Sequence, residues 1–308
     1  MPLHPQAEAF LAAVAAQNRP GWEEMTPEEA RTVFDGLQEV FGEGADLPVV
    51  RDETVGSGIR VRCYSPSTEL PESVVLYFHG GGWVLGDLES HDSLCRNLCA
   101  ASGVQVVSVD YRRPPEHRYP AAIDDCHEVF KILRSEPGRF GIDPSKIVIA
   151  GDSAGGNLAA AVALRAKAEG DIQPAAQVLI YPAIEPNFES DSYRQFGTGF
   201  GLTAANMQWF WNHYLGPEIV LEKFPYAALR GRHSLKGLPE TFVVLAEYDV
   251  LHSEGQAFAS SMISEGSNVQ VKAYPGMLHG FVHFAAVFDS SREAIADMAD
   301  FIQKVAQR

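Results

Sequence analysis

Residues 147–157 read IVIAGDSAGGN, and this stretch decides the fold. Its first four residues are apolar and mostly β-branched, which is typical of a buried strand. The strand pattern breaks at Gly151, and an alanine-rich segment that favours a helix follows over residues 157–166. Ser153 stands at the junction in a G-x-S-x-G pattern, which is typical of a sharp strand-to-helix turn that exposes a nucleophile. Gly151 and Gly155 suit this turn because they carry no side chains that would collide where strand and helix approach closely.

The turn alone supports two interpretations. In one, Ser153 is a nucleophile, and the helix N-terminus brings its positive dipole end and free N–H groups toward a developing oxyanion. In the other, the serine is idle in a tight turn, because G-x-S-x-G also arises by chance in glycine-rich turns. The rest of the chain decides between them.

The composition is that of a globular protein with an acidic surface. The 308 residues suit one elaborated α/β domain. Lys and Arg number 24 against 40 Asp and Glu, a formal charge of −16, which argues against nucleic acid and anionic membranes as partners. No apolar run reaches the roughly 18 residues of a membrane span. The first residues also lack the basic region and apolar core of a signal peptide.

The four cysteines are Cys63, Cys95, Cys99 and Cys126. Cys95 and Cys99 stand four apart on an expected helix, which suits two small buried residues better than a disulfide. No cysteine or histidine spacing resembles a zinc site. We therefore expect a reducing, cytoplasmic location, and neither a metal nor a cofactor.

Strand and helix patterns alternate through most of the chain. Two helices, over residues 5–17 and 27–41, precede any strand and predict an N-terminal helical cap segment at residues 1–45. The expected strands then cover 47–55, 59–64, 74–78, 104–109, 146–150, 176–181, 241–246 and 269–274, and the expected later helices include 90–101, 120–133, 254–265 and 289–306. This alternation predicts an α/β fold, with a mostly parallel sheet that carries helices on both faces and forms a catalytic domain over residues 46–308.

The alternation fails between residues 181 and 238, where aromatic residues are frequent. The segment leaves the carboxyl end of a strand, the edge at which α/β sheets bind ligands. We interpret it as a cap insertion at about residues 185–235, with Phe200 and Trp209 among the expected substrate-pocket residues. The other interpretation is an aromatic satellite core that does not touch substrate.

A second motif, HGGGW, ends the buried strand at 74–78. Three consecutive glycines cost backbone entropy, and a loop that offers N–H groups to an oxyanion explains them. We expect the N–H groups of Gly81, Gly82 and Ala154 to form this oxyanion hole. Trp83, which ends the motif, is a further expected pocket residue. A flexible glycine turn is the other interpretation.

An acid and a histidine follow the last two strands. Asp249 comes directly after the strand at 241–246, and His279 stands in a loop after the strand at 269–274. The order Ser153, Asp249, His279 matches that of hydrolases built on this architecture. His279 would take and return the serine proton, and Asp249 would hold the imidazole tautomer. Leu251, beside the acid, is an expected pocket residue.

Other polar residues near these positions are weaker candidates. His283 is expected to start a helix, and His252 follows the acid too closely to be its partner across a site. Asp152 is expected to anchor a neighbouring loop and His79 to fix its own loop by hydrogen bonds. Glu247 and Glu254 are expected to make local structural hydrogen bonds.

These motifs together resemble the hormone-sensitive-lipase-like family of α/β-hydrolase carboxylesterases. The resemblance rests on HGGGW at 79–83, DYR at 110–112, PEHRYPAA at 115–122, GDSAGGNLA at 151–159, DVL at 249–251 and HGF at 279–281, and it covers residues 50–308. It implies an eight-stranded sheet, an N-terminal cap, Ser153, Asp249 and His279 as the triad, and short- to medium-chain esters as substrates. It also implies a possible homodimer.

The chain departs from the family pattern at two places. Residues 113–114 are RP where the family often has LA, and residues 250–255 are VLHSEG where it often has PLRDEG. Neither change touches the triad, and both concern loop details.

The sequence therefore predicts a serine carboxylesterase that acts on a small-molecule ester through an acyl-enzyme intermediate. An amidase or arylformamidase on the same triad is the alternative, since an HGGxW loop also resembles that of arylformamidases. A non-enzymatic small-molecule receptor is the third hypothesis, and it is disfavoured because all three triad residues are present.

Overall fold

The structure is a computed structural model that describes residues 2–308. Eight strands form one sheet: β1 (Val49–Val55), β2 (Ile59–Ser65), β3 (Val74–Phe78), β4 (Gln105–Asp110), β5 (Ile147–Asp152), β6 (Ala176–Ile180), β7 (Glu240–Tyr248) and β8 (Val269–Leu278). The helices are α1 (Pro5–Ala16), α2 (Pro27–Asp35), α3 (Gln38–Phe41), α4 (Asp92–Ser102), α5 (Ala121–Ser135), α6 (Pro137–Phe140), α7 (Ala154–Ala168), α8 (Asp191–Phe196), α9 (Ala204–Leu215), α10 (His252–Ser264) and α11 (Asp289–Ala306). Short 3₁₀ turns are η1 (Trp22–Glu24), η2 (Leu221–Lys223) and η3 (Phe281–His283).

The sheet is mostly parallel. Its strand order is β1-β2-β4-β3-β5-β6-β7-β8, and β2 pairs antiparallel with both of its neighbours. From β4 to β8 every pairing is parallel. The predicted α/β class, the eight strands and the parallel character are confirmed.

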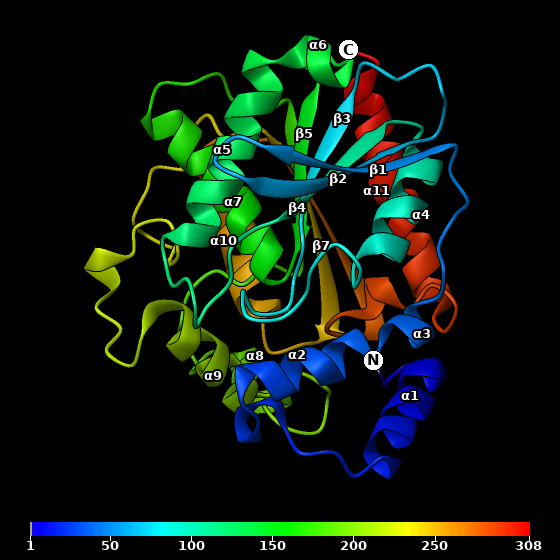
Figure 1. Ribbon diagram of the computed structural model, residues 1–308. Helices are drawn as coiled ribbons and strands as arrows, with labels where there is room; N and C mark the ends of the chain where they lie inside the picture. The colour runs from blue at the N-terminus through cyan, green and yellow to red at the C-terminus, as the bar shows by residue number, and fades with distance from the viewer. Residues whose placement is uncertain (1) are drawn as a thin grey trace.

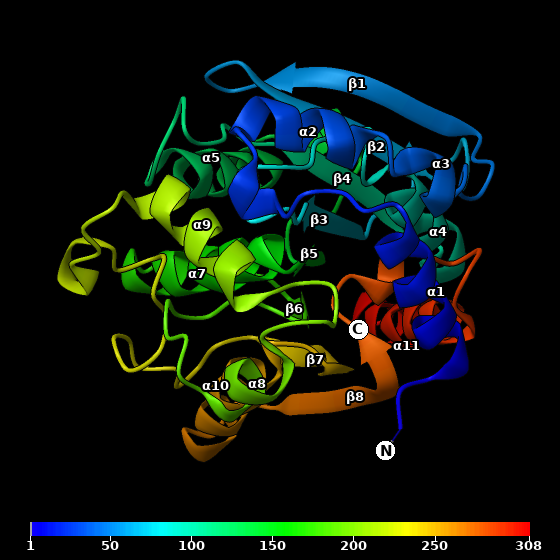
Figure 2. The ribbon, with the colours of Figure 1, turned by 90° about the horizontal axis from the view of Figure 1, so that it is seen from below.

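Helices cover both faces of this sheet, as predicted. Figure 2 shows α5, α7 and α10 on one side and α4 and α11 on the other. Two buried clusters match these layers: one includes side chains of α5 and α7, and the other includes side chains of α4 and α11. The central strands β3 and β5 are buried along their whole length, as parallel strands covered on both faces must be.

The two last strands are longer than their apolar patterns predict. Expected ends at residues 246 and 274 become Tyr248 in β7 and Leu278 in β8, which pair with each other beyond an irregularity in the register between Ala246 and Tyr248. The extension matters because it carries the chain directly to Asp249 and His279.

The N-terminal helices also differ from expectation. The single helix predicted over 27–41 is divided into α2 and α3, with Gly36 and Leu37 between them. Thr26 caps α2, since its hydroxyl accepts the N–H of Glu29 while the Glu29 carboxylate accepts the N–H of Thr26.

The N-terminal segment and the segment between β6 and β7 meet below the carboxyl end of the sheet. Figure 1 places α2, α8 and α9 at this end of the sheet. The amide of Asn206 in α9 donates to Glu23 of η1, which joins the two segments. Arg31 of α2 donates to the carbonyl of Val84 at 2.9 Å and forms an ion pair with Glu116 at 2.8 Å. Within residues 2–308, no helix has the length and apolar character of a membrane span.

The junction of β5 and α7 depends on a very close approach of backbone segments. A Cβ added to Gly155 would lie 1.9 Å from the carbonyl oxygen of Phe78 at the end of β3. A Cβ on Gly151 would lie 2.3 Å from the carbonyl oxygen of Gly155. Glycine is therefore required at both positions, as the sequence predicts.

We expect Gly155→Ala to lower the free energy of unfolding by about 3 kcal/mol or more, because the added methyl group meets backbone atoms that cannot move aside. Gly138→Ala is the matched control, since nothing lies within 4 Å of its added Cβ, and it should change stability by no more than about 1 kcal/mol. Urea denaturation of both variants checks this. Equal stabilities of the two variants would contradict the account of the turn.

Candidate active site

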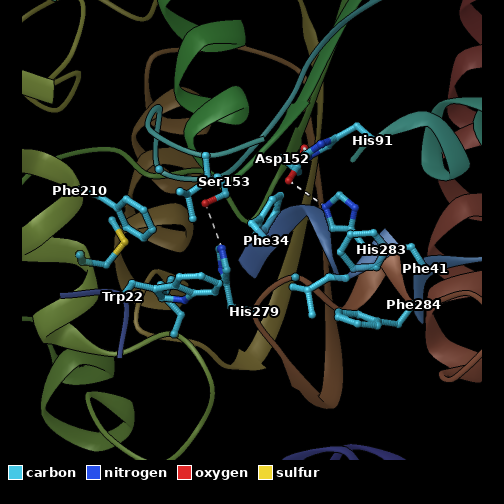
Figure 3. Close-up of a pocket in the computed structure, with 17 residues that line it drawn as sticks. Trp22, Phe34, Phe41, His91, Asp152, Ser153, Phe210, His279, His283 and Phe284 are labelled. Carbon is cyan, nitrogen blue, oxygen red and sulfur yellow. Dashed lines mark hydrogen bonds and ion pairs between the residues drawn. The ribbon is translucent and has the colours of Figure 1, made fainter. Parts of the chain in front are cut away.

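Three side chains from distant parts of the chain form a continuous hydrogen-bonded row. The Nδ1 atom of His279 lies 2.7 Å from the Oδ2 atom of Asp249, and its Nε2 atom lies 3.0 Å from the Oγ atom of Ser153. Because a carboxylate only accepts hydrogen bonds, Nδ1 carries the proton and Nε2 is free to accept the serine hydroxyl. Figure 3 shows His279 directly beneath Ser153.

The sheet brings these residues together. Ser153 follows β5, Asp249 follows β7 and His279 follows β8, so all three stand at the carboxyl ends of parallel strands. Ser153 has a φ of 55°, an uncommon value for a residue with a side chain, and its N–H donates to the carbonyl of Ile180 at 2.8 Å. This strained backbone places the hydroxyl at the start of α7.

The acid of the row is buried and held by a second hydrogen bond. Asp249 is 2% exposed, so its carboxylate forms hydrogen bonds with neighbouring protein groups instead of with solvent. Its Oδ1 atom accepts the N–H of Leu251 at 2.9 Å, which leaves Oδ2 directed to His279. The ring of Tyr181 lies beside His279, with 4.5 Å between the ring centroids.

The glycine loop lies against the same serine. Gly81 and Gly82 have φ values of 99° and 60° and line the cavity that contains Ser153. A Cβ on Gly82 would lie 2.1 Å from the ring of Phe210, so the loop and α9 are in direct contact. Within residues 2–308, no backbone carbonyl accepts the N–H groups of Gly81, Gly82 or Ala154. Three N–H donors are thus available beside Ser153.

Buried polar residues fix the position of this loop. The Oδ1 atom of Asp152 accepts the N–H of Gly80 at 3.0 Å and the hydroxyl of Tyr77 at 2.7 Å. Burial opposes the ionisation of Asp152, but the imidazoles of His91 and His283 hold its pKa well below the ordinary range. The expectation that Asp152 anchors a neighbouring loop is confirmed.

His79 supports the loop from its other side. Burial lowers the pKa of His79 to about 3, so the ring is neutral at pH 7. Its Nδ1 atom lies 2.9 Å from the carbonyl oxygen of Gly80, and the ring stacks on Tyr111 with centroids 4.0 Å apart. The hydroxyl of Tyr111 donates to the carbonyl of His79 at 2.7 Å. His79 is therefore a structural residue, as expected.

A cavity of about 170 Å³ opens at the serine. Its wall is mostly apolar, and it combines the N-terminal segment, the glycine loop, the segment around α9 and the chain after His279. The lining residues are Trp22, Phe34, Leu37, Phe41, Gly81, Gly82, Leu85, His91, Asp152, Ser153, Leu202, Met207, Phe210, His279, Gly280, His283 and Phe284.

Comparisons with known proteins agree with this fold. The family model described as alpha/beta hydrolase fold matches residues 75–283. The chain belongs to the α/β-hydrolase family. It is 31% identical to an ethyl acetate hydrolase of Pseudomonas putida, over 99% of each chain, and 35% identical to the carboxylesterase NlhH of Mycobacterium tuberculosis, over 88% of this chain and 81% of that one. A hyperthermophilic esterase from Pyrobaculum calidifontis is 36% identical and superposes with a TM-score of 0.94 over 100% of both chains.

The resemblance to hormone-sensitive-lipase-like carboxylesterases is therefore confirmed. The fold expected from it, with eight strands and helices on both faces, is the fold of this α/β hydrolase.

The four residues predicted for the substrate pocket are not among the residues that line the cavity. Trp83 and Leu251 are fully buried. The ring of Trp83 stacks on Tyr214, with centroids 4.4 Å apart and planes 10° from parallel. Trp83 has a φ of 62°, and the turn places its ring in the core behind the glycine loop instead of in the cavity. Leu251 also lies in the core, where its N–H supports Asp249.

The two residues predicted from the insertion face other neighbours. Phe200 packs on Phe196 and Tyr248, with ring centroids 5.4 and 5.2 Å away. Trp209 lies against His213 and is partly exposed. Phe210, the next residue of α9, lines the cavity instead, because consecutive helix positions point about 100° apart.

Most of the lining was missed in the sequence. Phe34, Leu37 and Phe41 follow the spacing of an apolar helical face, and this signal was available. The spacing does not indicate that this apolar face lines the cavity at Ser153. His283 was treated only as a weaker rival base, and it lies in the 3₁₀ turn η3.

His91, Asp152 and His283 form a buried polar cluster at the cavity wall. Their ligand-type atoms lie within 4.8 Å of one another. The Nε2 atom of His91 accepts the N–H of Gly80 at 3.1 Å, and the Nε2 atom of His283 lies 3.0 Å from the Oδ2 atom of Asp152. The hydrogen bond from Gly80 uses the electron pair of His91 Nε2, and the Nε2 atom of His283 carries the proton that it donates to Asp152.

Glu247 and Glu254 make structural hydrogen bonds, as expected, but with partners far along the chain, and His252 makes one as well. Glu247 accepts the N–H of Gly276 at 2.7 Å, and Glu254 accepts the N–H of Ile184 at 2.7 Å. The Nδ1 atom of His252 lies 2.7 Å from the carbonyl oxygen of Ala246. Burial raises the pKa of Glu254 well above its ordinary value of 4.5.

The raised pKa of Glu254 predicts a pH-dependent stability. Above about pH 4.5 the unfolded chain releases this proton while the folded chain keeps it, so the wild type loses stability as pH rises toward the folded-state pKa. Glu254→Gln has no proton to release. Its stability relative to the wild type should therefore increase between pH 5 and 8, by up to about 1.4 kcal/mol per pH unit.

Urea denaturation at several pH values measures this difference. Glu265→Gln is the control, because hydrogen bonds from Ser234 and neighbouring N–H groups lower the pKa of Glu265. This carboxyl is ionised in both the folded and the unfolded chain above about pH 5, so the stability difference between Glu265→Gln and the wild type should stay constant between pH 5 and 8. A Glu254→Gln curve parallel to the wild-type curve would disprove the assignment.

Proposed function

We propose that this α/β hydrolase is a serine carboxylesterase whose catalytic residues are Ser153, His279 and Asp249. The observation that carries the proposal is the hydrogen-bonded row of these side chains, beside the free N–H groups of Gly81, Gly82 and Ala154. The ester-hydrolase names of the similar proteins support the same chemistry.

In the first half-reaction, the Oγ atom of Ser153 attacks the ester carbonyl carbon while His279 takes the hydroxyl proton on Nε2. Asp249 stabilises the resulting imidazolium through the hydrogen bond at Nδ1. The carbonyl oxygen becomes an oxyanion, which the free N–H groups of the glycine loop and of Ala154 stabilise. His279 then gives its proton to the leaving alkoxide, so an alcohol departs and an acyl-serine remains.

The second half-reaction repeats these steps with water. His279 takes a proton from a water molecule, and the hydroxide attacks the acyl carbon of the ester on Ser153. The oxyanion forms in the same place, and the Oγ atom leaves with the proton that His279 returns. The products are a carboxylic acid and free enzyme, and every proton transfer uses the one imidazole.

We expect Ser153→Ala to lower kcat on an acyl p-nitrophenyl ester by roughly 10⁴-fold or more, because no acyl-enzyme can form. The chromogenic assay measures this directly. A fluorophosphonate probe should label the wild type and leave the variant unlabelled. Ser260→Ala, which removes an exposed hydroxyl on α10, is the control and should keep both activities. Retained hydrolysis by Ser153→Ala would refute the assignment.

The cavity also favours short- to medium-chain acyl groups. Its volume is only about 170 Å³, and large rings such as those of Trp22, Phe210 and Phe284 line it. We expect kcat/KM to be higher for esters with acyl chains of ~4–6 carbons than for those of ~12–16 carbons. A chain-length series measures it, and a maximum at the long chains would contradict the proposal.

An aryl formamide in the same series addresses the alternative substrate class. If the protein hydrolyses only the formamide, the proposed triad still holds, and the substrate class is an amide instead of an ester.

We further propose a homodimer and a cytoplasmic location, which stay predictions. The last strand, β8, stands at an edge of the sheet, where a second copy could pair with it. The thiols of Cys63, Cys95, Cys99 and Cys126 are free and buried, as suits a reducing compartment. The division into a cap at residues 1–45, a catalytic domain at 46–308 and a cap insertion at about 185–235 is likewise our proposal.

A further inference from the structure

A second carboxylate–imidazole pair lies next to the catalytic one. Asp152 precedes Ser153, and His283 follows His279 by four residues. The Nε2 atom of His283 lies 3.0 Å from the Oδ2 atom of Asp152, and both residues line the cavity. Figure 3 shows this pair on one side of the Ser153–His279 hydrogen bond. The hydrolytic steps above do not use it.

The pair does not serve only to compensate the charge of Asp152. The carboxylate already accepts the hydroxyl of Tyr77 and the N–H of Gly80, and both of these donors come from the body of the fold. His91, the other imidazole in contact with Asp152, has both ring nitrogens occupied, by the N–H of Gly80 and by the Ser90 hydroxyl. In His283, by contrast, only one ring nitrogen forms a hydrogen bond with the part of the chain that the structure describes.

His283 keeps one ring nitrogen unused. Because the Asp152 carboxylate only accepts, the Nε2 atom of His283 carries the proton. Burial lowers the pKa of His283, so the ring is neutral at pH 7 and Nδ1 holds a free electron pair. Within residues 2–308, no hydrogen bond reaches this Nδ1 atom. Asp152 thus fixes a tautomer whose free atom can only accept.

The side chain of His283, which carries this free acceptor, lines an apolar part of the cavity. Phe41 lies 5.3 Å from the His283 ring, measured between centroids, and Phe34, Leu37 and Phe284 line the same region. A polar atom in such surroundings loses free energy unless it finds a hydrogen-bond partner. A substrate that supplies a donor at this place gains the interaction that the protein leaves open.

We propose that His283, held by Asp152, is a binding site for a hydroxyl group on the ester substrate. This hydroxyl group donates a hydrogen bond to Nδ1 of His283. This inference rests on the proposed esterase function and extends it to a substrate class, the hydroxylated esters. The hydroxyl can belong to the acyl chain or to the alcohol of the ester, since both bind around Ser153.

Paired esters test the proposal. Ethyl 3-hydroxybutyrate is compared with ethyl butyrate for the acyl side, and 3-hydroxybutyl acetate with butyl acetate for the alcohol side. The quantity measured, by acid release at constant pH, is the ratio of kcat/KM for the hydroxylated ester to that for the plain one. His283→Gln places its amide N–H near the position of Nε2 and keeps the bond to Asp152, but it lacks the Nδ1 acceptor. We expect this variant to lower the ratio by about five- to tenfold in one of the two pairs.

Two further variants separate recognition from a change in structure. His283→Asn places an amide oxygen near the position of Nδ1, so its ratio should exceed that of His283→Gln. Tyr77→Phe removes a donor to Asp152 from a fully buried position outside the cavity, and its ratio should equal that of the wild type. Thermal denaturation confirms that each variant is folded.

Each result decides between the proposals. The hydroxyl site is overturned if the kcat/KM ratios of the wild type and His283→Gln are equal in both pairs. It is also overturned if Tyr77→Phe lowers the ratio as much as His283→Gln does. In either case, hydrolysis of the plain esters still supports the esterase function. If the folded wild type hydrolyses none of the four esters, the esterase function fails and this inference fails with it.

Discussion

The close approach of α7 to the end of β3 is the constraint on which the site depends. Gly155 lies so near the carbonyl of Phe78 that an added Cβ would come within 1.9 Å of its oxygen. A helix seated there forces the preceding residue, Ser153, into a φ of 55°, and this projects the hydroxyl from the sheet edge. The glycine loop begins directly after Phe78, so the same contact places the N–H groups of this loop beside Ser153, where we propose that an oxyanion forms. One backbone packing requirement thus positions two parts of the chemistry.

Asp152 links these parts electrostatically. It belongs to the elbow through its chain neighbour Ser153, and to the glycine loop through the N–H of Gly80. A buried carboxylate is stable only when several donors surround it, and here Tyr77, Gly80 and His283 do so. Because the charge needs all of these partners in place, the loop and the elbow are held together before substrate binds. Such preorganisation is what stabilisation of an oxyanion requires.

The sequence predicted which residues come together at Ser153 better than it predicted the lining of the cavity. Ser153, Asp249 and His279 each follow a strand directly, and parallel strands end at one edge, so local patterns suffice to group them. The pocket depends on contacts between segments far apart, which no local pattern contains. Trp83 was favoured because it is a large ring beside Gly82, yet its backbone turn directs the ring to Tyr214. The long-range packing that decides between neighbours such as Trp209 and Phe210 is a property of the folded chain.

The two walls of the cavity, one with Trp22 and Phe210 and the other with His283, are positioned by different contacts. Trp22 and Phe210 belong to segments that meet through polar contacts such as that of Asn206 with Glu23, and these segments carry none of the reacting groups. Substitutions there can change which ester fits while the triad keeps its geometry. His283 belongs to the other wall, four residues after His279 and bonded to the residue before Ser153. Its distance from the reacting atoms is therefore set by the sheet edge, and a substrate group that binds it is placed relative to Ser153 with the rigidity of the core.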